Sequence, residues 1–201
     1  MNDLRTPVRF GKTGLMVSPM SLGTMMFGGA TPDKDAQIIA DMALDNGVFF
    51  WDTADMYSTG ASEEVCGTLL KGRRNDVILA TKVFATMSDR PNDRGLSARH
   101  IMQACDDSLR RLKTDWIDLY YLHFPDEAPI EESLRAMEDL CRSGKVRYLG
   151  CSNYRAWEIV GLLNTAKKNS WQPISAVQPL YNIANRDIEV ELLPMTQHYG
   201  L

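Results

Sequence analysis

The sequence lacks the features that mark membrane-spanning, secreted or nucleic-acid-binding proteins. No apolar stretch approaches the roughly 20 residues that a helix needs to cross a bilayer, and residues 1–7 lack the apolar core of a signal peptide. The four cysteines, at positions 66, 105, 141 and 151, form no C-x-x-C pair and have no histidine at zinc-ligand spacing. The formal charge of −4 comes without runs of basic residues and interleaved aromatics. We therefore expect a cytoplasmic protein with reduced cysteines, no bound metal, and neither a nucleic-acid nor a membrane partner.

What the sequence does contain is an alternation of short β-rich runs and longer amphipathic runs. The composition, 44% hydrophobic and 24% charged, is typical of a globular protein. A small leading hairpin is predicted from residues 8–10 and 15–17. Six strands are then predicted at residues 20–23, 48–51, 77–81, 116–122, 146–150 and 174–177. Each is followed by a predicted helix, at residues 31–46, 62–71, 97–111, 130–142, 154–168 and 189–199.

Six strand-then-helix units in a row favour a parallel sheet with its helices packed outside. The run Val77-Ile78-Leu79-Ala80 is apolar throughout, as expected for a strand that is buried on both faces. Periodicity alone does not separate a closed barrel from an open, doubly wound sheet. Because no linker or low-complexity segment divides the chain, we expect residues 1–201 to form a single domain.

Polar residues recur where each predicted strand ends and its loop begins, which is the side of an α/β fold that binds ligands. Taken singly, each has an ordinary structural explanation as a turn, cap or packing residue. Their shared position at one rim of one sheet is what suggests a site. The set comprises Asp52, Tyr57, Lys82, His123, Ser152, Asn153 and Gln178. His100 and His198 fit no such arrangement, and we expect both at the surface.

The chemistry of this set favours protonation of an oxyanion. Tyrosine holds its proton at neutral pH, and a nearby ammonium such as Lys82 stabilises the phenolate, so that Tyr57 becomes a usable general acid. Asp52 can hold Lys82 in place by a charge-assisted hydrogen bond. A neutral His123 can donate an N–H to a carbonyl oxygen. The oxyanion would form by hydride addition, and the hydride must come from a cofactor because no side chain provides one.

Several segments, in the same order, resemble aldo-keto reductases. The stretch from Asp52 to Gly67, DTADMYSTGASEEVCG, is similar to the first signature of that family. The similarity continues through Thr81-Lys82, DWIDLYYLH, GKVRYLGCSN and QPLYN. The opening segments FGKTGLMVSP and LGTM resemble the bacterial and fungal branch related to aryl-alcohol dehydrogenases. The resemblance covers essentially the whole chain, and several co-linear motifs are far more specific than any one alone.

The resemblance implies a (β/α)8 barrel that reduces aldehydes or ketones with NADPH as the usual hydride donor. By motif, Tyr57 is the general acid, Lys82 and Asp52 tune it, and His123 orients the substrate. The choice of NADPH over NADH comes from the resemblance and not from any residue. The implied cofactor-binding residues are Gly23, Thr24, Asp52, Ser152, Asn153 and Gln178. The first two would line the cofactor cleft, and the last three would face the nicotinamide carboxamide.

The expected barrel is incomplete. The sequence ends about where a seventh strand would begin, which leaves the hairpin and about six βα units of the eight that the fold needs. In the resembling family, the aromatic that stacks on the nicotinamide and the residues that hold the cofactor phosphates lie beyond this point. Unpaired edges on the first and sixth strands would invite self-association.

Three interpretations follow. The first is an NADPH-dependent carbonyl reductase of the aldo-keto type. The second is a truncated, inactive member that acts at most as an interaction or regulatory module through its open edge. The third, an unrelated barrel enzyme such as an isomerase or aldolase, would need Lys82 to form a Schiff base, and nothing in that chemistry requires Tyr57 beside it. The natural substrate and the oligomeric state stay open.

Overall fold

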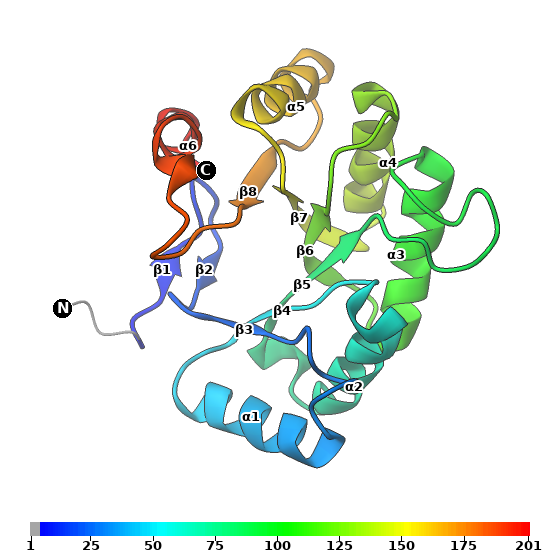
Figure 1. Ribbon diagram of the computed structural model, residues 1–201, viewed down its shortest axis with the longest axis vertical. Helices are drawn as coiled ribbons and strands as arrows, with labels where there is room; N and C mark the ends of the chain where they lie inside the picture. The colour runs from blue at the N-terminus through cyan, green and yellow to red at the C-terminus, as the bar shows by residue number, and fades with distance from the viewer. Residues whose placement is uncertain (1–4) are drawn as a thin grey trace.

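The computed structural model describes residues 5–201, and it contains a curled parallel sheet with helices packed on its outer side (Figure 1). The strands are hydrogen-bonded in sequence order. They are β3 (Ser21–Gly23), β4 (Phe50–Asp52), β5 (Ile78–Val83), β6 (Ile117–Leu122), β7 (Val146–Ser152) and β8 (Ile174–Gln178). The helices are α1 (Asp33–Asp45), α2 (Ala61–Leu69), α3 (Ala98–Leu112), α4 (Ile130–Arg142), α5 (Ala156–Asn169) and α6 (Leu192–Tyr199). This is a (β/α)8-type barrel over six of its units, and it confirms the expected fold class.

The helix boundaries follow local chemistry. Ser97 caps α3, because its Oγ accepts a hydrogen bond of 3.2 Å from the backbone N–H of His100, as the sequence predicts. Helix α1 is preceded by Pro32, which gives no side-chain cap. Helix α2 begins one residue before the predicted Ser62, because the hydroxyl of Ser62 turns into the core instead of capping the helix.

The core has two layers, one on each face of the sheet. Along β6, Leu119 and Tyr121 belong to the inner cluster, whereas Tyr120 and Leu122 pack outward against the helices. Burying one such large side chain contributes about 1.5–3 kcal/mol. Gly150 of β7 makes room on the inner side, because a Cβ at this position would overlap the ring of Tyr121.

The leading hairpin closes the end of the barrel where the strands begin. Its two strands, β1 (Val8–Arg9) and β2 (Met16–Val17), pair antiparallel as predicted. Phe10, which follows β1, packs edge-to-face on Phe50 of β4 with 5.8 Å between ring centroids. Both rings pack against the inner cluster, and Phe50 is the first residue of its strand. The C-terminal ends of the strands, where ligand-binding residues are expected, therefore lie at the opposite end.

The prediction that His100 lies at the surface is wrong, because only 1% of this residue is exposed. The loop between β5 and α3 folds over the first turn of α3, which brings Asp93 Oδ1 to 3.7 Å from His100 Nδ1. Burial lowers the pKa of His100, although the nearby carboxylates of Asp93 and Asp107 oppose this shift. His198 is exposed, as predicted.

The ends of the sheet are open within residues 5–201, since β3 and β8 each pair with one neighbour only. In the same range, no helix combines the length and apolarity that crossing a bilayer requires. No cluster of three His, Cys, Asp or Glu side chains in that range is arranged to hold a metal ion.

Candidate active site

The strand register brings the predicted residues to one end of the sheet. Gly23 is opposite Asp52, Asp52 is opposite Ala80, and Ser152 is opposite Gln178. Because all these strands are parallel, the residues at their C-terminal ends share one rim.

Lys82 of β5 is the centre of the arrangement. Its side chain is wholly buried, and Nζ donates hydrogen bonds to Asp52 Oδ2 at 2.7 Å, to the carbonyl oxygen of Thr53 at 2.8 Å and to Tyr57 Oη at 2.9 Å. An ammonium has three N–H donors, so these three acceptors satisfy it completely. A buried charge is costly unless it is paired and hydrogen-bonded in this way. The contacts join the end of β4, the turn after it and β5.

Tyr57 is presented by an unusual turn. The segment Tyr57–Gly60 has a left-handed backbone at Ser58, Thr59 and Gly60, with φ of 49°, 51° and 91°. Residues with a Cβ adopt this conformation at a cost of roughly 1–2 kcal/mol each, so the surrounding structure must impose it. Gly29 contributes, because a Cβ there would lie 2.6 Å from Ser58 Oγ. The turn directs the half-buried phenol of Tyr57 back towards β5.

His123 follows β6 and lies beside the phenol. Its ring is edge-to-face with that of Tyr57 at 6.1 Å between centroids, and it stacks on Phe124 at 4.7 Å. Burial and the positive charge of Lys82 lower the pKa of His123 to about 4, so the imidazole is neutral at physiological pH. Its buried Nδ1 has no hydrogen-bond partner in the described part of the chain.

Ser152, Asn153 and Gln178 form one connected group at the ends of β7 and β8. Ser152 Oγ donates to the Gln178 carbonyl oxygen at 2.8 Å, and Asn153 Nδ2 reaches Ser152 Oγ at 3.1 Å and the His123 carbonyl oxygen at 3.0 Å. Asn153 has a φ of 63°, a conformation that asparagine tolerates better than most residues. The half-buried side-chain amide of Gln178 makes no hydrogen bond within residues 5–201.

Gly23 and Thr24 differ in their accessibility. Gly23 is exposed at the end of β3, with open space where a side chain would be. The side chain of Thr24 is wholly buried, and its Oγ1 donates to the Asp52 carbonyl oxygen at 3.0 Å. Ser62, which the sequence suggested only as a helix start, bonds the Thr24 carbonyl oxygen at 2.8 Å and contacts Thr53 Oγ1 at 2.9 Å. These buried hydroxyls fix the backbone that carries Asp52.

Two wholly buried carboxyl groups lie behind β5, and sequence reasoning missed both. Glu63 is fully paired, since it accepts hydrogen bonds from Thr81 Oγ1 at 2.5 Å and from Arg111 Nε at 2.7 Å. Asp55 accepts one from the Phe84 N–H at 3.2 Å, whereas its Oδ1 has no partner in the described structure. Burial and the charge of Glu63 raise the pKa of Asp55 to about 7. The available signal was that both acids lie within six residues of Tyr57, and hydrophobic periodicity does not distinguish them from surface residues.

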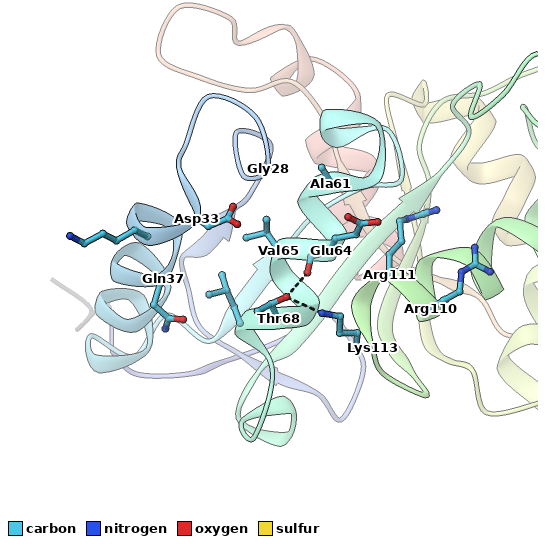
Figure 2. A pocket seen from close by; sticks show the side chains of 12 residues that line it. Gly28, Asp33, Gln37, Ala61, Glu64, Val65, Thr68, Arg110, Arg111 and Lys113 are labelled. Carbon is cyan, nitrogen blue, oxygen red and sulfur yellow. Dashed lines mark hydrogen bonds between the residues drawn. The ribbon is translucent and has the colours of Figure 1, made fainter.

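An apolar cavity of about 380 Å³ lies near the predicted catalytic residues. Its walls are Met56, Thr59, Phe84, Ala85, Thr86, Met87 and Phe124. A larger cavity, of about 900 Å³, lies among α1, α2 and α3 and contains none of the four predicted catalytic residues. Figure 2 shows Thr68 on its wall, with Lys113 Nζ donating to Thr68 Oγ1 at 3.0 Å. Neither cavity is lined by the four predicted catalytic residues, but the smaller one is lined by Met56 and Phe124, which are next in sequence to Tyr57 and His123.

Comparisons with known proteins point in one direction. The family model described as "Aldo/keto reductase family" matches residues 19–201. The chain is 42% identical to "Uncharacterized oxidoreductase YrpG" of Bacillus subtilis (strain 168), over 95% of this chain and 62% of that protein. It is 37% identical to "Versiconal hemiacetal acetate reductase" of Aspergillus parasiticus, over 96% of this chain and 64% of that protein. It is 36% identical to "Probable voltage-gated potassium channel subunit beta" of Arabidopsis thaliana, over 95% of this chain and 60% of that protein. The chain spans about three-fifths of the length of these relatives.

Proposed function

The chain belongs to the aldo/keto reductase family, and from this premise we propose that it reduces aldehydes and ketones to alcohols with NADPH as hydride donor. The observation that carries the proposal is the set of three hydrogen bonds from the buried Lys82 ammonium, one of them to the Tyr57 phenol. No structural requirement of a barrel explains why a buried cation should meet a phenol at the ligand-binding rim.

Tyr57 is the proposed general acid. Its oxygen accepts a hydrogen bond from Lys82, so its own proton is directed elsewhere and can pass to a carbonyl oxygen. The Lys82 ammonium then stabilises the negative charge that remains on the phenol oxygen. Asp52 keeps the ammonium in place, and water restores the proton of Tyr57 after each turnover.

His123 is the proposed substrate-orienting residue. A neutral imidazole carries one N–H donor, and here it lies at the edge of the Tyr57 ring. Tyr57 and His123 together would provide two donors for one carbonyl oxygen. A charged imidazolium next to Lys82 would be unfavourable, which supports hydrogen bonding and not proton transfer as the role of His123.

The cofactor side of the proposed site consists of Ser152, Asn153 and Gln178 at the ends of β7 and β8, and of Gly23 at the end of β3. The side-chain amide of Gln178, which makes no hydrogen bond within residues 5–201, fits a carboxamide because the two groups have complementary donors and acceptors. The open surface at Gly23 allows close approach to the backbone, whereas Thr24 would act indirectly, by fixing the backbone next to Gly23, since its hydroxyl, N–H and carbonyl oxygen are all used internally. When bound, NADPH supplies the hydride that the substrate carbon accepts.

The apolar cavity suggests which carbonyl compounds fit. Phe84 and Phe124 lie 5.4 Å apart between ring centroids, and Met56 and Met87 complete a wall without charged groups. An aldehyde with an aromatic or other apolar substituent would bury that substituent there, with its oxygen towards Tyr57.

We further propose that residues 1–201 constitute one barrel domain and that two more βα units close the barrel in the active enzyme. The support is the pair of edges on β3 and β8 within residues 5–201, together with the greater length of the relatives. Contacts to the cofactor phosphates would then come from those units.

A cofactor titration tests the proposed function. The purified chain is titrated with NADPH while its intrinsic fluorescence is followed, and NADPH oxidation is assayed with an aromatic aldehyde. Saturable quenching and aldehyde-dependent oxidation are the expected results, with NADPH bound more weakly than by the closed barrel because residues 1–201 contribute the nicotinamide contacts without those to the phosphates. If millimolar NADPH gives no saturable quenching, the enzyme proposal fails for this chain and the family assignment is unaffected.

A non-catalytic role is the second candidate, and the unpaired edges of β3 and β8 favour it. Such an edge can pair with a strand of another copy. Self-association that depends on protein concentration, in a chain that does not bind NADPH, is the result that would support this candidate over the first.

A further inference from the structure

Asp55 is a buried acid that the reaction proposed above does not use. It lies two residues before Tyr57, just ahead of the turn that carries the phenol, and none of its surface is exposed. A buried carboxyl group with an unsatisfied oxygen costs free energy, so its retention calls for a reason.

The contacts of Asp55 reach the end of β5 on both sides of Val83. Its backbone N–H donates to the Lys82 carbonyl oxygen at 3.2 Å, and its Oδ2 accepts from the Phe84 N–H at 3.2 Å. One residue therefore holds the backbone before and after Val83. Residues 82–84 are thus fastened to the turn that begins with Tyr57.

The residues held in this way belong to the candidate site. Lys82 supplies the ammonium that meets the phenol, and Phe84 forms a wall of the apolar cavity. Phe84 contacts Phe124, on which the ring of His123 stacks. A shift at the end of β5 would move the ammonium and the cavity wall together.

We propose that Asp55 is a positioning residue whose side-chain oxygen, as a hydrogen-bond acceptor, fixes the end of β5 against the Tyr57 turn and so keeps Lys82 in contact with the phenol. The charged groups that face it are Glu63 of α2 and Arg111 of α3, and Tyr120 of β6 lies within their electrostatic influence. Since Arg111 already pairs with Glu63, Asp55 has no ion-pair partner within residues 5–201, and an acceptor oxygen is what it offers in either protonation state. Any effect of Asp55 on catalysis rests on the function proposed above. Its role in holding the end of β5 against the Tyr57 turn does not.

Asp118 of β6 provides a matched control, because it also binds the backbone of β5. Its Oδ2 accepts the Leu79 N–H at 2.9 Å, near the start of β5, and also pairs with Arg74 at 2.8 Å. Asp118→Ala thus removes an acid that fastens β5 at the end away from Lys82.

The test measures two NMR signals in the free protein, without cofactor or substrate. One is the hydrogen-exchange rate of the Phe84 amide, which reports the Asp55 contact. The other is the Lys82 ammonium resonance, which three hydrogen bonds should protect from exchange with water, and which Lys82→Met identifies. In Asp55→Ala we expect Phe84 exchange to rise at least about tenfold and the Lys82 resonance to disappear. In Asp55→Asn, which keeps an acceptor oxygen, and in Asp118→Ala, both signals should stay as in the parent protein.

Three outcomes overturn the proposal. Faster Phe84 exchange with an unchanged Lys82 resonance in Asp55→Ala would make Asp55 a local structural residue only. Loss of the Lys82 resonance in Asp55→Asn would assign the effect to charge, and its loss in Asp118→Ala would show that any weakening of β5 suffices. If Asp55→Ala does not fold, Asp55→Glu replaces it, since the carboxyl group is displaced by one methylene and the same loss is expected. Failure of NADPH binding would leave this result untouched.

Discussion

Lys82 Nζ lies 2.9 Å from Tyr57 Oη, although 25 positions separate the two residues. Lys82 is on β5, whereas Tyr57 is in the turn that follows β4. The contact is made across the rim of the barrel, and Asp52 completes it from a third position at 2.7 Å. Lys82 and Asp52 form a buried ion pair, and removing one of them leaves the charge of the other unpaired. Single substitutions at these positions should therefore cost stability.

Lys82→Met should destabilise the protein by about 3–5 kcal/mol, because it leaves the Asp52 carboxylate unpaired in a buried position. The double variant Asp52→Asn, Lys82→Met should recover much of that loss and yet remain unable to reduce aldehydes. Urea unfolding followed by circular dichroism gives the stabilities. The single variant Asp52→Asn completes the cycle, and a destabilisation of the double variant equal to the sum of the two single ones would show that Asp52 and Lys82 are not energetically coupled.

His123 should stay neutral from pH 8 down to near its lowered pKa of about 4. The unfolded chain takes up this proton near the ordinary value of about 6.5, so the His123 contribution to stability is present above that pH and is lost as pH falls towards 4. NMR titration of the imidazole resonances, with His123→Gln for assignment, measures this directly. An ordinary histidine titration would contradict the burial of the ring beside Lys82.

The contribution of Asp55 to stability should change with pH in the opposite direction to that of His123. The pKa of Asp55 is raised from the ordinary value of 3.8 to about 7, so the folded protein binds more protons than the unfolded chain in that interval. Stability attributable to Asp55 is therefore full below pH 4 and falls as pH rises to about 7. Asp55→Asn should gain stability relative to the parent protein over the same range, as measured by denaturant unfolding at several pH values. A difference independent of pH would mean that Asp55 does not titrate there.

Two helical glycines offer a matched stability test. A Cβ at Gly67 of α2 would overlap the backbone of α3 at Arg111 and Leu112, so Gly67→Ala should destabilise by several kcal/mol. A Cβ at Gly161 of α5 would meet Ile130 Cδ1 at 3.6 Å, an ordinary contact, so Gly161→Ala should stabilise by about 0.5–1 kcal/mol. Thermal unfolding of the two variants distinguishes these signs. If Gly67→Ala instead stabilises the protein as Gly161→Ala does, α2 and α3 do not pack in close contact at Gly67.

The common location of the strand-end residues could be predicted from the sequence, because two facts determine it. The alternation of strands and helices gives a parallel sheet, and parallel strands end at a common rim, so Asp52, Lys82 and His123 must be near one another. The contact of Tyr57 with Lys82 could not be predicted from these two facts. It depends on a left-handed turn at Ser58 and Thr59, a conformation that the sequence propensities of these residues do not favour.

The buried polar residues behind the sheet could not be predicted in the same way. Ser62 and Glu63 look like a helix start, and Asp55 looks like a loop acid, because sequence patterns do not reveal which element packs over a given side chain. His100 was misplaced for the same reason. The loop that brings Asp93 over it has no periodicity from which its path could be inferred.

The account depends most on Tyr57 as the source of the transferred proton. The direct measurement compares Tyr57→Phe with the parent protein for NADPH binding by fluorescence and for aldehyde reduction by NADPH oxidation. We predict that the variant binds NADPH with nearly unchanged affinity and loses reduction by at least about a hundredfold, since phenylalanine keeps the ring and removes only the acid. Unchanged turnover in Tyr57→Phe would contradict the account.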